Sequence, residues 1–159
     1  MVSTAQELRT GSAQIGDLRT IPRGSQRAST WRMPIRSFQD LLVWQRSMQL
    51  AQDAYPMIRR LPADERFELC AQMRRAVVST PSNIAEGFGY GSTRRYVHHL
   101  RIALGSNAEF LTHLMPAERL QLVSADETKP LIDHASQIGR MLNALIQSLQ
   151  RYERGSLAP

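Results

Sequence analysis

The fold is decided by LIDHASQIGRMLNALIQSLQRY, residues 131–152, in which apolar side chains return every three or four residues. The apolar positions are Leu131, Ala135, Ile138, Leu142, Leu145, Leu149 and Tyr152. This spacing places them along one face of an α-helix that packs against a core. Just upstream, Ser124 and Glu127 have the i, i+3 spacing of a capping box. The sequence therefore predicts a long amphipathic helix that begins after Ser124.

Three further segments between residues 37 and 116 repeat the same helical period. Their apolar positions are Leu41, Trp44, Met48, Ala51, Tyr55 and Ile58; then Cys70, Met73, Val77, Thr80, Ile84 and Phe88; then Val97, Leu100, Leu104, Leu111 and Leu114 or Met115. Ser37 with Asp40, and Ser92 or Thr93, are the expected caps of the first and third helices. Four helices joined by short turns predict an all-α, antiparallel up-down-up-down four-helix bundle over residues 37–154.

Proline occurs within each of these three patterns. Because proline removes an intrahelical hydrogen bond, Pro56 predicts a kink or an early end of the first helix. The apolar spacing continues past Pro81, so we expect the second helix to bend there and continue to Glu86. Pro116 is expected to close the third helix.

The two ends of the chain differ in composition from the predicted bundle. Residues 1–36 hold six arginines and two acids, a net charge of 6 − 2 = +4, with few aliphatic side chains. Such a segment buries too little apolar surface to offset its ordering entropy, so we expect a disordered arm, and a disordered tail over residues 155–159. The arm is either a basic segment that grips nucleic acid or sequence upstream of a natural start at Met33.

The whole chain is basic, with 20 Lys+Arg against 14 Asp+Glu and a net charge of +6. Lys129 is its only lysine, and an arginine-rich surface suits bidentate contacts with phosphate or carboxylate. Arginine-rich codon usage explains the same composition. No run approaches the roughly 18 apolar residues that span a bilayer, and the first residues lack a secretory signal, so we expect a cytoplasmic protein.

Few residues suit catalysis or metal binding. Cys70 is the lone cysteine and lies in an apolar stripe, where it is expected to act as a small hydrophobe. Glu109 and His113 stand at i, i+4, but no second helix repeats that pair, as a di-iron bundle would require. The glycines of residues 87–91 lack the lysine of a P-loop and are expected to form a flexible turn. We therefore predict no catalytic residue, no cofactor and no metal.

The second helix carries a polar row, Arg75, Ser79, Asn83 and Glu86, on an otherwise apolar element. Buried polar rows are tolerated only when they are fully hydrogen-bonded. The favoured interpretation is a structural network that fixes helix register, or a seam between subunits. The alternative is a substrate pocket between subunits in which Glu86 is the base and Arg75 assists.

The third helix carries a second apolar row, Tyr96, Ala103 and Phe110, offset from its core stripe. A helix with more apolar positions than its core needs often covers a subunit interface, which predicts a homo-oligomer. A compact bundle with wide apolar stripes produces the same pattern.

The strongest functional signal is a basic cluster at the start of the third helix, with a pair of arginines on the second. The candidate nucleic-acid-binding residues are Arg94, Arg95, His98, Arg101, Arg74 and Arg75. Tyr90 and Tyr96 lie among them, and arginines beside aromatic rings suit phosphate contact combined with base stacking. The alternative is a solvated face in which these residues pair with Glu65, Glu68 and Glu109.

Three segments resemble a known family. ERFELCAQMRRAVVSTPSNIAEGFGYGS (65–92), RIALGSNAEFLTHL (101–114) and RMLNALIQSL (140–149) are similar to the four-helix-bundle proteins of the large-subunit rRNA intervening-sequence family. SFQDLLVWQRSMQLA (37–51) resembles that family's first helix, so the resemblance covers about residues 38–149. The PSNIAEG element is its most specific part, and Pro56 departs from the pattern.

This resemblance implies a four-helix bundle that assembles as a ring of five subunits. Some members are encoded inside rRNA intervening sequences, and a distant branch binds nucleic acid as an accessory to a reverse transcriptase. The family has no catalytic residues to carry over. The resemblance implies structural or interface roles for Arg74, Arg75, Pro81, Asn83, Glu86, Gly87, Gly105, Ser106 and Glu109.

Together these patterns predict a non-enzymatic, oligomeric four-helix-bundle scaffold associated with nucleic acid, RNA ahead of DNA. The rival hypothesis is a protein–protein adaptor ring without nucleic-acid binding, whose basic charge reflects codon usage.

Overall fold

The computed structural model describes residues 35–156, which form four α-helices and two short 3-10 turns. The α-helices are α1 (Leu42–Arg60), α2 (Leu69–Gly89), α3 (Thr93–Arg119) and α4 (Ala125–Ser156). The turns η1 (Phe38–Asp40) and η2 (Ala63–Arg66) precede α1 and α2. No strand occurs within the described residues, so the predicted all-α class is confirmed. Of the arm predicted over residues 1–36, residues 1–34 lie outside the described residues.

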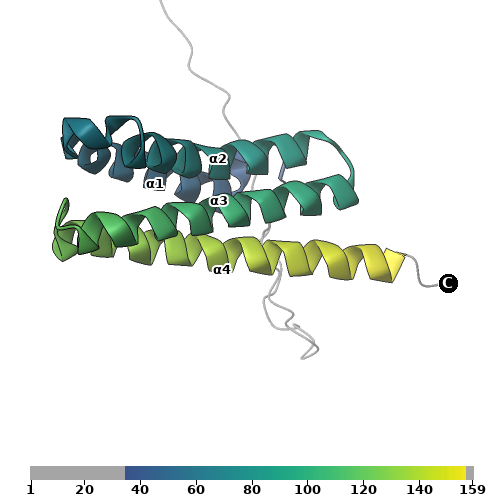
Figure 1. Cartoon of the computed structure of the whole chain (residues 1–159). Coiled ribbons are helices and arrows are strands. Elements are labelled where there is room, and N and C mark those ends of the chain that lie inside the picture. Colours follow the sequence, from purple (N-terminus) through teal and green to yellow (C-terminus); the bar gives the residue numbers. More distant parts are fainter. Residues whose placement is uncertain (1–34, 157–159) are drawn as a thin grey trace, which may run out of the picture. The chain divides into compact units, whose positions relative to one another are not determined.

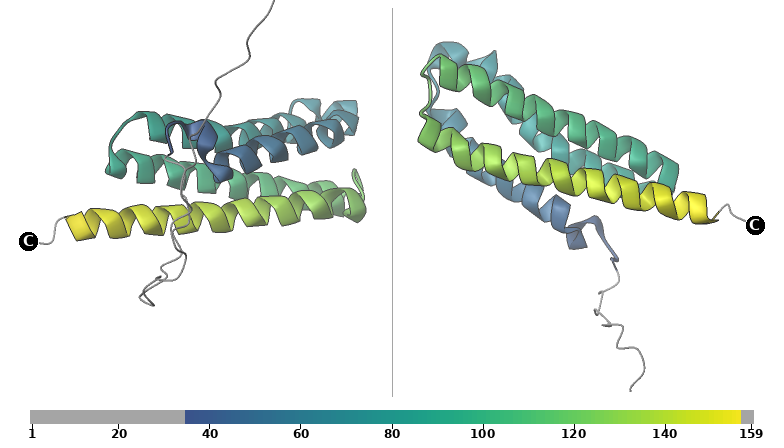
Figure 2. Two further views of the ribbon diagram at one scale, coloured as in Figure 1. Left: turned by 180° about the vertical axis from the view of Figure 1, so that it is seen from behind. Right: turned by 90° about the horizontal axis from the view of Figure 1, so that it is seen from below.

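The helices lie side by side, with the α2–α3 turn at one end and the α1–α2 and α3–α4 turns at the other (Figure 1). Each helix packs against two neighbours: α1 contacts α2 and α4, and α3 contacts α2 and α4. The C-terminal end of α4 projects beyond the α2–α3 turn in all three views (Figures 1 and 2). α4 reaches Ser156, two residues past the predicted end of the bundle at residue 154.

The core confirms the predicted stripes of α2 and most of α4. Met73, Ile84, Ile138 and Leu142 are fully buried, whereas Tyr152 at the end of the α4 stripe is exposed. For α1 the predicted stripe is partly wrong. The buried positions of α1 are Val43, Ser47, Leu50, Ala51, Ala54, Met57 and Ile58, while Trp44 and Tyr55 are half-buried and Met48 is exposed. The small side chains of Ser47, Ala51 and Ala54 belong to this buried face of α1. The buried Ser47 hydroxyl donates a hydrogen bond to the Val43 carbonyl at 2.7 Å.

For the second apolar row of α3, burial favours the compact-bundle alternative over the subunit interface. Ala103 and Phe110 are 0% exposed, and Tyr96 is half-buried with its ring 6.0 Å from that of Phe88 on α2. Leu104 and Leu111 of the predicted core stripe are only half-buried. α3 therefore uses both rows inside the bundle, and Ala103 and Phe110 leave no surface for a subunit interface.

The helix boundaries agree better with the predicted capping residues than with the helix ends predicted at prolines. Glu127 accepts from the backbone N–H of Ser124 at 3.1 Å, and the Glu127 N–H donates to the Ser124 hydroxyl at 3.4 Å, which confirms the capping box. Ser37 and Asp40 also form a capping box, but it opens only the turn η1. Pro56 lies inside α1, and α3 continues past Pro116 to Arg119 rather than ending there. α2 does continue through Pro81, as predicted.

No helix in residues 35–156 combines the length and the apolar character needed to cross a membrane.

Candidate nucleic-acid interface

The turn between α2 and α3 positions the basic cluster. α2 ends at Gly89, and Gly91 takes a φ of +62°, a left-handed conformation that glycine adopts without steric cost. Ser92 is the N-cap of α3, but its side chain makes no cap hydrogen bond, and the first turn of α3 contains no acidic residue. The positive end of the α3 dipole is therefore left without a negative side chain from its own first turn.

Three of the predicted residues share one face at this end of the bundle. Arg94, His98 and Arg101 are exposed and line a surface hollow of about 260 Å³ with Val97 of α3. The opposite wall is formed by Gln150 and Glu153 from the last turns of α4. Their i, i+4, i+7 spacing brings the three basic residues together, as the sequence predicted.

Arg95 lies beside this hollow and makes a different contact. Its guanidinium stands over the Tyr90 ring, 5.3 Å from the ring centroid, in a cation–π arrangement. The His99 ring lies 5.1 Å from that of Tyr90, and the Tyr90 hydroxyl donates to Glu86 at 3.1 Å. Arg95 is thus held on the surface by an aromatic ring rather than by a carboxylate.

Two arginines of this region were missed by the sequence prediction. Arg151 and Arg154 are exposed on the last turns of α4, beside the two α4 residues that line the hollow. They are separated from Arg101 by about fifty residues of sequence, so only the packing of α4 along α3 brings the two groups to one end. Helical spacing alone carries no signal for that proximity.

The two ends of the bundle differ in charge. The basic end, residues 82–104 and 147–156, holds five arginines and two glutamates, which gives 5 − 2 = +3. The acidic end, residues 53–75 and 109–133, holds seven Lys+Arg and nine Asp+Glu, which gives 7 − 9 = −2. A polyanion is therefore attracted to the basic end and repelled from the other.

The two ends also differ in the ion pairs that their basic side chains form. At the acidic end Arg60 binds Glu127 at 2.5 Å and Lys129 binds Asp133 at 3.2 Å. Within residues 35–156 no ion pair involves an arginine of the basic end.

The structure does not bring the six predicted binding residues together. Arg75 donates to Gln72 and lies 3.7 Å from Glu109, so its charge is already balanced within the chain. Arg74 lines a separate hollow with Arg59 and Cys70. Arg75 faces Glu109, which stands fourteen residues after Arg95 on α3, roughly 21 Å along the helix axis at 1.5 Å per residue.

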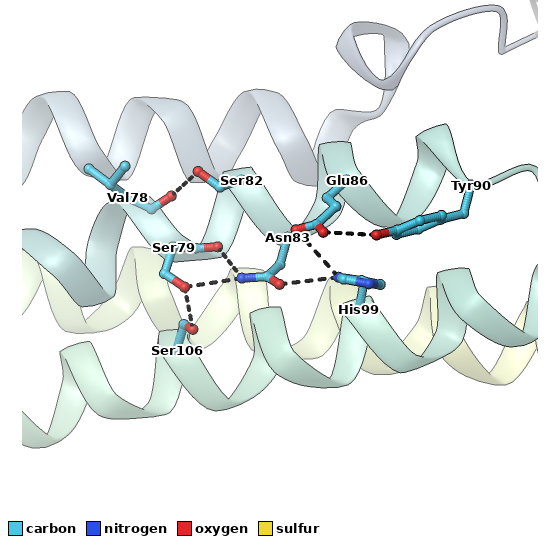
Figure 3. Close-up of polar contacts among 8 residues, drawn as sticks. All are labelled: Val78, Ser79, Ser82, Asn83, Glu86, Tyr90, His99 and Ser106. Carbon is cyan, nitrogen blue, oxygen red and sulfur yellow. Dashed lines mark hydrogen bonds and ion pairs between the residues drawn. The ribbon is translucent and has the colours of Figure 1, made fainter.

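A continuous polar seam joins α2 to α3 next to the basic end (Figure 3). The Ser79 and Ser106 hydroxyls are 2.8 Å apart, and Asn83 donates to the Ser79 carbonyl at 2.9 Å. His99, whose side chain is 15% exposed, lies 3.3 Å from the Asn83 oxygen and 3.7 Å from Glu86 (Figure 3). Three members of the predicted polar row, Ser79, Asn83 and Glu86, therefore belong to one network within the chain, whereas Arg75 pairs separately with Glu109. Such a network fixes the register of α3 against α2.

Gly87 allows α2 and α3 to approach each other closely beside this network. It is buried inside α2 rather than part of a flexible turn, which corrects the sequence prediction. A Cβ added to Gly87 would lie 2.7 Å from the His99 Cβ and 3.0 Å from the Tyr96 ring. By contrast, a Cβ added to Gly105 would have no described atom within 4 Å, so no helix of this chain uses that small residue for close packing.

The other groups with potential chemistry are embedded in packing. Cys70 is buried, its sulfur lies 3.7 Å from the Ile58 carbonyl, and burial raises the pKa of its thiol. Burial also raises the pKa of Tyr96 to about 12, because its ring packs between α2 and α3. Within residues 35–156 no three His, Cys, Asp or Glu side chains gather as a metal site would require. Glu86 and Arg75, the pair of the pocket hypothesis, stand eleven residues apart on α2, roughly 16 Å along its axis.

The fold and the basic end define an all-α protein with exposed arginines gathered at one end of its helices. Residues 39–144 match the family described as 23S rRNA-intervening sequence protein, and the chain belongs to this family. The resemblance carried by the PSNIAEG region is thereby confirmed.

A solved structure shares the fold. It is the 1.70 Å crystal structure of a protein with unknown function from the S23 ribosomal protein family of Bacteroides thetaiotaomicron VPI-5482. The two superpose with a TM-score of 0.62 at 21% sequence identity, over 66% of this chain and 95% of that one. No curated protein matches the sequence.

Proposed function

We propose that this protein is a non-enzymatic scaffold that binds single-stranded nucleic acid, RNA ahead of DNA, in the cytoplasm. One observation carries the proposal: the basic end gathers arginines from α3 and α4 that make no ion pair within residues 35–156. The family description, which links its members to intervening sequences of 23S rRNA, favours RNA as the partner.

The chemistry of the basic end suits a phosphate backbone. Arg94 and Arg101 are exposed on one helix face, and a guanidinium binds phosphate oxygens through two parallel N–H donors. The nearby start of α3 adds a positive potential from the helix dipole. Each bound phosphate releases counterions from the polymer, so affinity falls as salt rises.

Salt dependence is the direct test of the proposed function. The full chain is titrated against a long single-stranded RNA and against a short oligonucleotide by filter binding, over a series of salt concentrations. We expect affinity for the long RNA to fall by at least about tenfold for a severalfold rise in salt, and the short oligonucleotide to bind more weakly. Binding that does not change with salt, or no binding at all, would favour the adaptor hypothesis.

Self-assembly is the second part of the proposal. The resemblance implies an antiparallel bundle that closes into a ring of five subunits. Apolar side chains remain exposed on all four helices of the single chain, among them Leu42, Val78, Ile102 and Tyr152. A ring would repeat the basic end once per subunit, so weak contacts would add along one strand.

Light scattering tests the assembly separately. We expect a mass of five times the 18.0 kDa chain. A monomer at micromolar concentration would contradict the assembly and leave each basic end to bind alone.

A further inference from the structure

The hollow at the basic end contains one group that a simple phosphate-binding surface would exclude. Glu153 lines it together with Arg94, His98 and Arg101, and Glu153 is half-buried. Yet within residues 35–156 the Glu153 carboxylate forms no ion pair with any of these residues. A carboxylate that balances no neighbouring charge lowers the affinity of this surface for phosphate, because like charges repel.

The rest of the hollow fits the face and edge of a nucleobase. Val97 is a buried apolar residue of its wall, and Gln150 adds an amide that both donates and accepts hydrogen bonds. Unpaired bases of single-stranded RNA are recognised through such contacts to their Watson–Crick edges. Arg94 and Arg101, which line the same hollow and are exposed, remain available for the phosphates on either side of that base.

We propose that this hollow is a base-reading subsite in which Glu153 selects cytosine over uracil. The inference rests on the proposed binding of single-stranded RNA. Cytosine presents the N4 amino group as a donor, and a carboxylate accepts from it. Uracil presents the O4 carbonyl at the same position, so its oxygen faces the negatively charged Glu153. Glu153 is thus a specificity-determining residue, while Arg94 and Arg101 supply affinity for either base.

Paired titrations with oligo(C) and oligo(U) of equal length test the subsite. They are run on the full chain by fluorescence anisotropy at mildly alkaline pH, where oligo(C) stays single-stranded. We expect oligo(C) to bind at least about fivefold more tightly than oligo(U), the low end for one good base contact. In Glu153→Ala the ratio should fall to near one, because the acceptor is lost.

Asp133→Ala is the matched control. Asp133 lies on the same helix at the acidic end, where it pairs with Lys129, and its loss changes the net charge by the same amount. This variant should keep the preference for oligo(C). If Glu153→Ala strengthens binding to both oligomers equally, or if the parent shows no preference, Glu153 only repels phosphate and the inference is overturned while the proposed function stands. If neither oligomer binds, both are overturned.

Discussion

At the acidic end, where the α1–α2 and α3–α4 turns lie, charged side chains form ion pairs with one another. The arginines of the basic end, beside the α2–α3 turn, are exposed to solvent. Arg60 and Glu127 illustrate the first case, since they join α1 to α4 across 67 residues of sequence. Arg94 and Arg101 illustrate the second. Paired charges contribute to folding, and a cluster of unpaired like charges costs stability unless a ligand neutralises it. The difference therefore separates an end held by ion pairs from the end that we propose binds nucleic acid.

The largest expected effect on stability comes from the close contact of Gly87 on α2 with His99 on α3. Gly87→Ala should lower the free energy of unfolding by about 1–3 kcal/mol, because the new Cβ would collide with the His99 Cβ at 2.7 Å. Gly105→Ala is the control on α3: with open space around it, alanine should raise stability by up to about 1 kcal/mol. Urea denaturation measures both. Equal effects of the two substitutions would contradict the close packing of α2 against α3.

A smaller effect is expected at the acidic end, and it depends on pH. Hydrogen bonds from the Ser124 backbone and then from Arg60 lower the pKa of Glu127 from 4.5 to about 2. A carboxyl whose pKa is lower in the folded state stabilises the fold above its unfolded pKa, and that contribution is lost as pH falls. Between pH 4.5 and 2 the parent should therefore lose stability more steeply than Glu127→Gln.

The urea midpoint at successive pH values checks this expectation. RNA binding at neutral pH should be the same for the parent and Glu127→Gln. Identical acid sensitivity of the two proteins, or weaker RNA binding by the variant, would contradict the distinction between the acidic end and the basic end.

Much of the fold was predictable because it rests on local signals. The Ser124–Glu127 capping box and the apolar period of residues 131–142 are set by neighbours in sequence, and both are confirmed. The stripe of α1 was misread because Ser47 and Ala54, which are buried, carry little hydrophobic signal. The sequence left two alternatives for the row of Ala103 and Phe110, and the structure decides between them because α3 packs between α2 and α4, which buries more than one stripe.

The candidate site was predictable only in part. Arg94, His98 and Arg101 share a face because of helical geometry, which sequence spacing reveals. Gln150 and Glu153 join them only through the packing of α4 on α3, a tertiary contact that sequence spacing does not encode. Conversely, Arg75 looked equivalent to Arg94 in sequence, but Glu109 from α3 neutralises it.

The most direct test of a binding site at the basic end compares the loss of two arginines there with the loss of two arginines at the acidic end. Arg94→Ala with Arg95→Ala, and Arg60→Ala with Arg75→Ala, change the net charge equally, so overall attraction to a polyanion falls by a similar amount. Binding of each double variant to a long single-stranded RNA is measured by anisotropy at one low salt concentration, after circular dichroism confirms that it is folded. We expect at least about tenfold weaker binding for the first variant and a change of less than about twofold for the second. Equal losses in both would show that the arginines act only through net charge, and the basic end would not be the binding site.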